Sequence, residues 1–159
     1  MMQLQLLQPG DAEALLSFYE SVKGTPGSVW DKGYPAMENV LDDIARACAW
    51  AFMEEGRIVA SSSTEEDDVL LTDCPVDRSL RSVCITRVAV ARDHQGQGLA
   101  ARLVEALLPI LRERGIQAAR LLVSDQNPAA MKTYAACGFR IVGSCFMYGH
   151  SYLCEERLL

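Results

Sequence analysis

The stretch SVCITRVAVARDHQGQGLAARLVEALLPIL, residues 82–111, decides the fold of this chain. Residues 82–90 are mostly apolar and rich in β-branched side chains, which is typical of a buried strand. From Leu99 onward apolar residues recur at helical spacing, and Gly96 and Gly98 lie between the two segments. A helix N-terminus binds anions because its first N–H groups lack intrahelical partners and the helix dipole adds about half a positive charge. The stretch therefore predicts a phosphate-binding site at residues 95–100.

Two common nucleotide-binding loops do not fit this segment. The dinucleotide fingerprint G-x-G-x-x-G requires a third glycine, where this chain has Ala101, and it follows an N-terminal strand rather than one in mid-chain. The mononucleotide P-loop requires a lysine, and this loop contains none. The bound phosphate is therefore expected to belong to another kind of molecule.

Hydrophobic periodicity and turn residues define the rest of the chain. Strands are expected at 3–7, 49–53, 57–63, 80–90, 118–124, 139–147 and 148–158, and helices at 12–22, 37–46, 99–115 and 128–137. The order β-α-α-β-β-β-α-β-α-β-β predicts one domain, residues 1–159, with a mixed α/β sheet and helices on both faces. Residues 65–78 are polar and acidic and are expected to form a surface loop.

Charge and cysteine usage exclude several classes of protein. The net charge of −6 argues against nucleic-acid binding. No apolar run approaches the roughly 20 residues that span a bilayer, so no membrane partner is expected. Without a signal-peptide pattern at residues 1–11, a cytoplasmic location is predicted. The six cysteines contain no C-x-x-C pair, which excludes a zinc knuckle, and they are expected to be reduced and buried.

The loop at residues 23–35 is rich in glycine and proline and carries Trp30 and Tyr34. Aromatic side chains in such a loop serve either as a lid over a pocket or as a plug for the core. Both interpretations stay open at the level of sequence.

Two motifs carry a resemblance to a known family. Gln95-x-x-Gly98-x-Ala100 resembles the pyrophosphate loop, Q/R-x-x-G-x-G/A, of the GNAT superfamily of N-acetyltransferases. NPAAMKTYAACGF, residues 127–139, is similar to that family's N-x-x-A-x-x-x-Y-x-x-x-G-F element. The element order agrees over nearly the whole chain, and the Trp30…Tyr34-Pro35 segment is similar to one subgroup of small bacterial members.

The resemblance implies a GNAT fold: a mostly antiparallel sheet of six to seven strands in which the fourth and fifth strands are parallel and are splayed by a bulge. It implies acetyl-CoA as cosubstrate and no metal. Its implied cofactor contacts are the backbones of Val88, Ala89 and Val90, the loop residues Gln95, Gly96, Gln97, Gly98, Leu99 and Ala100, and the side chains of Asn127 and Tyr134. Asn127 could equally be a helix cap, and Tyr134 a core residue.

The implied reaction is the transfer of an acetyl group to a primary amine of a small molecule or peptide, by direct attack in a ternary complex. Tyr134 occupies the position of the family's general acid, while a backbone N–H near Val88 or Ala89 could bind the oxyanion. Acidic residues on the N-terminal side suit a cationic acceptor. A longer-chain acyl transferase and a non-catalytic acyl-CoA sensor remain alternatives, and a homodimer is left open.

The general base has no assignment. Many family members use a glutamate on the central strand, but residues 82–90 contain no carboxylate. Candidates outside that strand are Glu65, Glu66, Asp67, Asp68, His150 and Glu155, and none of them is chosen. For the phosphates, the cationic candidates are Arg92, His94 and Arg102.

Overall fold

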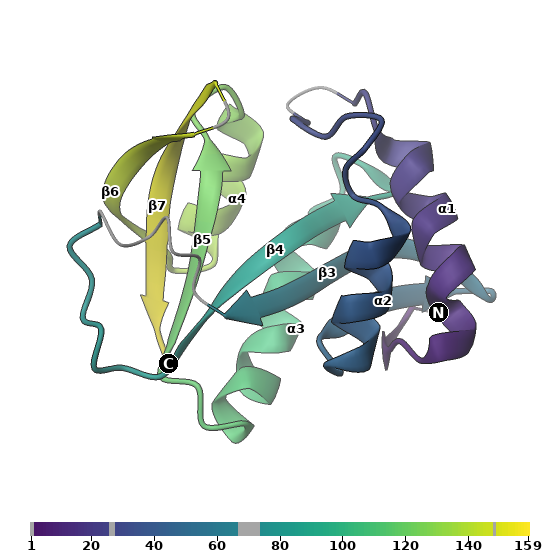
Figure 1. Cartoon of the computed structure of the whole chain (residues 1–159), viewed down its shortest axis with the longest axis horizontal. Coiled ribbons are helices and arrows are strands. Elements are labelled where there is room, and N and C mark those ends of the chain that lie inside the picture. Colours follow the sequence, from purple (N-terminus) through teal and green to yellow (C-terminus); the bar gives the residue numbers. More distant parts are fainter. Residues whose placement is uncertain (1, 26–27, 67–73, 148) are drawn as a thin grey trace.

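The computed structural model describes residues 2–25, 28–66, 74–147 and 149–159 (Figure 1). The strands are β1 (Gln3–Leu6), β2 (Ala49–Glu54), β3 (Arg57–Glu66), β4 (Ser82–Val90), β5 (Ala118–Ser124), β6 (Arg140–Met147) and β7 (His150–Leu158). The helices are α1 (Ala12–Val22), α2 (Met37–Ala45), α3 (Leu99–Glu113) and α4 (Pro128–Ala136), with short 3-10 turns η1 (Pro9–Asp11) and η3 (Arg92–His94). The predicted element order is confirmed. Several boundaries shift, and the largest correction is that Glu65 and Glu66 belong to β3 and not to a loop.

The strands form one sheet in the order β1-β2-β3-β4-β5-β7-β6, in which β4 and β5 are parallel and the other described pairs are antiparallel. The parallel pairing is short: it joins Ser82 to Ala118, Val83 to Ala119 and Cys84 to Arg120. Beyond Cys84 the two strands diverge, as Figure 1 shows. The predicted mixed sheet with a parallel fourth and fifth strand is confirmed.

A buried guanidinium holds the closed end of this divergence. Arg120 is 1% exposed and donates to Glu156 on β7 (2.8 Å), to the Ser82 hydroxyl (2.9 Å) and to the Asp77 carbonyl (2.9 Å). Because charge-assisted bonds of this kind are directional and a buried cation needs its partners, β4, β5, β7 and the segment before β4 are fixed together here.

A β-bulge lies in β4 beyond the parallel pairing. Ala89 pairs with Ser61 and Thr86 with Ser63, so Arg87 and Val88 share one opposing residue on β3. Arg87 has φ of 50°, in the left-handed region. An extra residue bends its strand and raises the local twist, and here it turns β4 away from β5. The bulge that the family resemblance implied is therefore present.

The Arg87 side chain is buried against α2. Its Nε donates to Oδ2 of Asp43 (2.8 Å) and its Nη2 to Oδ1 (2.7 Å), while Arg46 donates to the same Oδ1 (2.7 Å). Asp43 is completely buried and the Arg87 side chain is 4% exposed. A bidentate pair in this position satisfies both desolvated charges and fixes α2 on the bulged strand.

Helices cover both faces of the sheet, as predicted (Figure 1). On one face α1 and α2 bury an apolar cluster that includes Leu15, Tyr19, Val40 and Ile44. On the other face, α3 and α4 contribute Leu107 and Tyr134 to a second apolar cluster. This cluster also includes Trp50, Ile85, Leu121 and Phe139. In the described residues no helix is long and apolar enough to cross a membrane.

One cysteine pair departs from the prediction of reduced thiols. Cys74 and Cys154 form a disulfide that joins residues 80 positions apart. The pair ties the segment that leads into β4 to β7, and Cys84 and Cys145 pack in the same buried cluster. Spacing alone could not reveal this pair, because only the fold brings the two residues together.

An ion-pair network ties η3 to the turn between β2 and β3. Arg57 donates to Asp93 (2.8 Å), while His94 contacts Asp93 through Nδ1 (2.8 Å) and Glu54 through Nε2 (3.1 Å). The hydrogen bond with Asp93, which outweighs desolvation, raises the pKa of His94 above its ordinary value, and Glu54 adds to the effect. His94 is therefore a structural residue of this turn.

We predict that Asp43→Ala will lower the free energy of unfolding by about 3–5 kcal/mol, because it leaves the buried Arg87 guanidinium without its main partner. Chemical denaturation measures the loss. The control is Asp42→Ala, since the neighbouring Asp42 side chain is 67% exposed in its pair with Arg46. Its cost should stay below about 1 kcal/mol. Equal losses in the two variants would contradict a dominant buried pair.

The second prediction concerns His94 and pH. Its folded pKa is raised, so its ion pairs stabilise the protein fully below the unfolded pKa of about 6.5 and are lost as the pH rises through the folded value. Melting temperatures of wild type and His94→Gln should therefore differ most below pH 6.5 and converge as the pH rises into the alkaline range. His150→Gln is the control, because it replaces a histidine by glutamine outside this network. A wild-type-to-His94→Gln difference independent of pH would refute the assignment.

Candidate active site

The predicted phosphate loop follows the open end of β4. Residues 95–98 are exposed, and α3 begins immediately after them. Gly96 (φ +80°) and Gly98 (φ +75°) are both left-handed, a conformation that glycine adopts without the strain of a side chain. The Gln95 amide donates to the Val90 carbonyl (3.1 Å), which closes the loop on the end of the strand.

The loop presents unused hydrogen-bond donors. In the described part of the chain no protein acceptor takes the N–H groups of Gly98, Leu99 and Ala100 at the start of α3. These groups and the positive end of the helix dipole together form a site that suits an anion. The Leu99 side chain is 2% exposed and packs in the core, so this residue offers only its backbone.

Along the end of β4, too, the side chains are packed in the core and only the backbone is available to a ligand. Val88, Ala89 and Val90 pack their side chains into the clusters on the two faces of the sheet. Since β5 pairs with β4 only as far as Cys84, no strand among the described residues lies beside their backbone groups on that side. The residues predicted to hold an extended ligand can therefore do so through the main chain alone.

Tyr134 comes from α4, on the face where α3 and α4 contact each other. It is 8% exposed and makes an edge contact with Phe139, with ring centroids 6.1 Å apart. Burial raises the pKa of its hydroxyl above the ordinary value of 10, and Cys137 and Glu155 add to the effect. The hydroxyl therefore keeps its proton at neutral pH, which is the state a proton donor must have.

Asn127 caps α4. Its Oδ1 accepts the N–H of Ala130 (3.1 Å), which confirms the helix-cap interpretation. The contact with a cofactor that the family motif implies stays a prediction for this residue.

The three cationic candidates for binding the phosphates differ in the contacts that they already make within the protein. Arg92 donates to the carbonyls of Ser21 (2.7 Å) and Lys23 (2.6 Å) and so caps the end of α1. His94 belongs to the network with Asp93 and Glu54 described above. Arg102 is exposed in the first turn of α3, beside the unpaired N–H groups. Among the three, Arg102 is placed best for a phosphate.

The aromatic residues of the loop before α2 have different roles. Trp30 packs edge-on against Tyr19, with ring centroids 5.2 Å apart, and so plugs the core. Tyr34 is 38% exposed, precedes a cis peptide bond to Pro35, and accepts a hydrogen bond from Arg87 Nη1 (3.0 Å). The core-plug interpretation is therefore confirmed for Trp30, and the lid interpretation stays a prediction for Tyr34. Positions 26 and 27 lie outside the described residues.

One candidate base lies beside Arg87. Glu65 accepts from Arg87 Nη2 (3.2 Å) on the face of the sheet that α1 and α2 cover. Glu66 follows it on β3 and so points to the opposite face, while Glu155 is buried on β7. Asp67 and Asp68 lie outside the described residues. The buried pair of Arg87 and Asp43 was not predicted from the sequence. The signal that could have indicated it is the presence of an arginine within an apolar strand.

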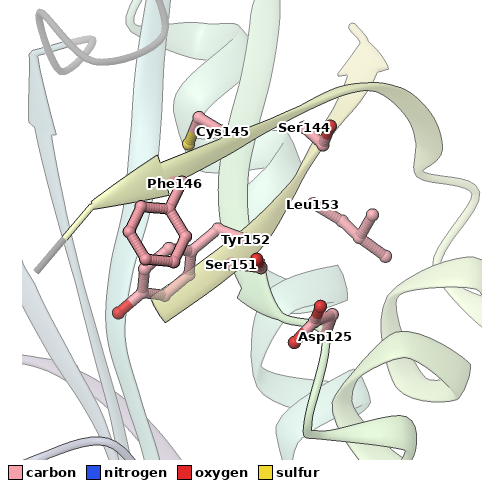
Figure 2. Close-up of a pocket in the computed structure, with 7 residues that line it drawn as sticks. All are labelled: Asp125, Ser144, Cys145, Phe146, Ser151, Tyr152 and Leu153. Atoms are coloured by element: carbon pink, nitrogen blue, oxygen red, sulfur yellow. The ribbon is translucent and has the colours of Figure 1, made fainter. Parts of the chain in front are cut away.

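A pocket of about 490 Å³ lies on the hairpin of β6 and β7 (Figure 2). Figure 2 shows its lining side chains: Asp125, Ser144, Cys145, Phe146, Ser151, Tyr152 and Leu153. None of the predicted cofactor-binding residues lines it. In the described chain no cluster of histidine, cysteine, aspartate and glutamate side chains could hold a metal ion.

The chain is similar to several N-acetyltransferases. It is 28% identical to the human N-acetyltransferase 8B over 120 residues, which are 71% of this chain and 50% of that protein. It is also 28% identical to the probable N-acetyltransferase camello of Xenopus tropicalis over 114 residues, 69% of this chain and 43% of that protein. The chain thus spans about half the length of these relatives.

Solved structures share the fold. A GNAT-family acetyltransferase from Streptococcus agalactiae superposes with a TM-score of 0.83 at 18% identity, over 99% of this chain and 95% of that one. YncA from Salmonella typhimurium, a putative acetyltransferase solved with acetyl-CoA, gives 0.80 at 18% identity, over 100% and 94% of the two chains.

The family is established by the match of residues 15–139 to the model of the acetyltransferase (GNAT) family. That match begins within α1 and ends just after α4, so it includes the bulged strand, the glycine loop and Tyr134. The chain belongs to the acetyltransferase (GNAT) family.

Proposed function

We propose that the protein transfers an acetyl group from acetyl-CoA to a primary amine of a small molecule or peptide, by direct attack in a ternary complex. The observation that carries the proposal is the unpaired edge of β4, which runs from the end of its pairing with β5 to the open N–H groups at the start of α3. An extended ligand with a pyrophosphate at one end matches this combination.

Coenzyme A has that chemistry. Its pyrophosphate would accept hydrogen bonds from the main chain of residues 95–100, where two left-handed glycines admit close approach. Its pantetheine amides would bond to the backbones of Val88, Ala89 and Val90 as a short added strand. Asn127 would add a contact from the start of α4. The presence of acetyl-CoA in the structure of YncA, which shares the fold, supports this assignment.

The reaction requires one charge to be stabilised and one proton to be supplied. As the amine attacks the thioester, its carbonyl oxygen becomes an oxyanion, which a backbone N–H near Val88 or Ala89 would bind. The departing sulfur then takes a proton, and the raised pKa of Tyr134 keeps that hydroxyl protonated until the thiolate forms. Tyr134 is accordingly proposed as the general acid.

The names of relatives support an amine as acceptor. A 55-residue segment is 36% identical to N-alpha-acetyltransferase 30 of Schizosaccharomyces pombe, covering 35% of this chain and 37% of that protein. The ribosomal-protein-S18-alanine N-acetyltransferase of Escherichia coli shares the fold, with a TM-score of 0.77 at 20% identity over 99% and 94% of the two chains. Peptides therefore belong among the acceptors to be tested.

The proposed activity predicts release of free coenzyme A from acetyl-CoA when a suitable amine is added. A thiol-release assay should be run with spermidine, kanamycin, lysine and a tetrapeptide with a free N-terminus, and the acetylated product identified by mass spectrometry. A parallel series measures whether longer acyl-CoA molecules compete with acetyl-CoA as donors. Tight binding of acetyl-CoA with no transfer to any of the four amines would refute the proposal and favour a sensor.

A further prediction concerns Tyr134→Phe. Removal of the hydroxyl should lower kcat by about 10²-fold, within the usual contribution of a general acid. The dissociation constant of acetyl-CoA and the melting temperature should stay near those of the wild type, because the ring and its contact with Phe139 remain. An unchanged kcat would exclude Tyr134 from the mechanism.

A further inference from the structure

The Arg87 guanidinium gathers oxygen atoms from three separate elements. It donates to Asp43 on α2, to the Tyr34 hydroxyl in the loop before α2 (3.0 Å) and to Glu65 Oε2 on β3 (3.2 Å). Because the guanidinium is itself fixed by the bidentate pair with Asp43, it sets the positions of the other two oxygens.

Glu65 lies at the level where β4 and β5 begin to separate. Its partner across the antiparallel pair is Cys84, and Cys84 is also the last residue of β4 that pairs with β5. Directly opposed side chains in a sheet lie within about 4.5–5.5 Å of one another at Cβ. The Glu65 side chain on β3 is therefore a direct neighbour of the central strand at the point where that strand leaves β5.

The Glu65 carboxylate is only partly used by the protein. Oε2 accepts from Arg87, whereas Oε1 has no hydrogen-bond partner in the described parts of the chain. The side chain is 37% exposed. The protein thus fixes one oxygen of the carboxylate and leaves the other for a ligand.

The face of β3 that carries Glu65 is polar. Ser61, Ser63 and Glu65 alternate along β3 and so share one face. The hydroxyls of Tyr19, Ser61 and Ser63 are buried, and none makes a hydrogen bond of ordinary geometry to a described residue. The Tyr19 hydroxyl lies close enough to interact with the hydroxyls of both serines, so the face of β3 that carries Glu65 has a polar interior.

Other described carboxylates are less suited to the same role. Asp43 has both oxygens engaged by arginines and is completely buried. Glu156 is paired with Arg120. Glu66 lies on the opposite face of β3, and Glu155 lies on β7 among the residues beneath α4.

We propose that Glu65 binds the ammonium group of the acceptor and takes its proton, and that Arg87 is the positioning residue that orients it. This inference rests on the proposed function and adds to it a substrate class, a cationic primary amine. It also places the general base on β3, one strand away from the central strand.

The proton balance is complete. The ammonium R–NH₃⁺ gives one proton to Glu65 Oε1, and the freed lone pair forms the C–N bond to the thioester carbon. The C–S bond breaks, and the thiolate takes the Tyr134 proton, which solvent replaces. The second proton leaves the nitrogen for solvent as the amide forms, and Glu65 passes its own proton to solvent before the next turnover. An acetamide, coenzyme A thiol and one net proton are therefore released.

The test compares Glu65→Gln with Glu66→Gln. The first variant keeps the shape and removes the charge on the face that Arg87 contacts; the second makes the same exchange on the adjacent residue and the opposite face. The acceptor is whichever of spermidine, kanamycin, lysine and the tetrapeptide the wild type acetylates fastest. Rates are measured from pH 6.5 to 9.5, together with acetyl-CoA affinity and melting temperature.

Glu65→Gln should lower kcat/KM by about 10²-fold at pH 7. The loss should shrink as the pH rises toward the pKa of the amine, because the acceptor then arrives already deprotonated. The charged and titratable groups that face Glu65 are Arg87, Asp43, Arg46, Tyr34 and Cys84, and neither variant changes any of them. Glu66→Gln should keep the wild-type profile, and both variants should bind acetyl-CoA normally.

Three outcomes would overturn the inference alone: a wild-type rate for Glu65→Gln, a loss of the same size at every pH, or an equal loss in Glu66→Gln. A loss that does not change with pH would assign Glu65 a structural role. Absence of transfer by the wild type to all four amines would instead overturn the proposed function, and this inference with it. The two failures are therefore distinguishable.

Discussion

The rest of the structure depends on how briefly β4 and β5 are bonded together. Three residue pairs join them, Arg120 fixes the closed end, and the bulge at Arg87 and Val88 then turns β4 away. A parallel ladder that continued in this register to the end of β5, Ser124, would cover the backbone of β4 as far as Val88. The early end of this pairing therefore leaves a strand edge in the interior of the sheet rather than at its margin, and the glycine loop and α3 begin where that edge ends.

The proposed chemistry divides between the two faces of the sheet. Tyr134 and α3 lie on one face, with the donor's leaving sulfur expected near them. Glu65, Tyr34 and the loop before α2 lie on the other face, where the amine would arrive. Because β4 has side chains on both faces, the two reactants would meet at its bulge. The two proton transfers of the reaction would then be handled by groups that do not compete for the same space.

Local patterns predicted the elements that carry the donor site. Apolar periodicity located β4 and α3. Gly96 and Gly98 indicated the loop between them, and both adopt the left-handed conformation that glycine allows. The cluster around Arg87 was not predictable in this way. Its members Glu65, Asp43 and Tyr34 are 22, 44 and 53 residues from Arg87 in sequence. The register of β3 on β4 and the packing of α2 and of the loop before it bring them together. Asp43 resembled one more charge on a solvated helix face, and the Cys74–Cys154 pair was hidden by its separation of 80 residues.

Arg87 is not a glycine, although its φ of 50° is one that glycine would adopt freely. A left-handed conformation costs a residue with a side chain about 1–2 kcal/mol. Exchange for glycine would relieve that strain but leave Asp43 buried without its partner, whereas exchange for another side chain would keep the strain and lose the bidentate pair. Position 87 therefore tolerates substitution poorly, and redesign of acceptor preference is better begun at Tyr34, whose hydroxyl the same guanidinium holds without depending on it.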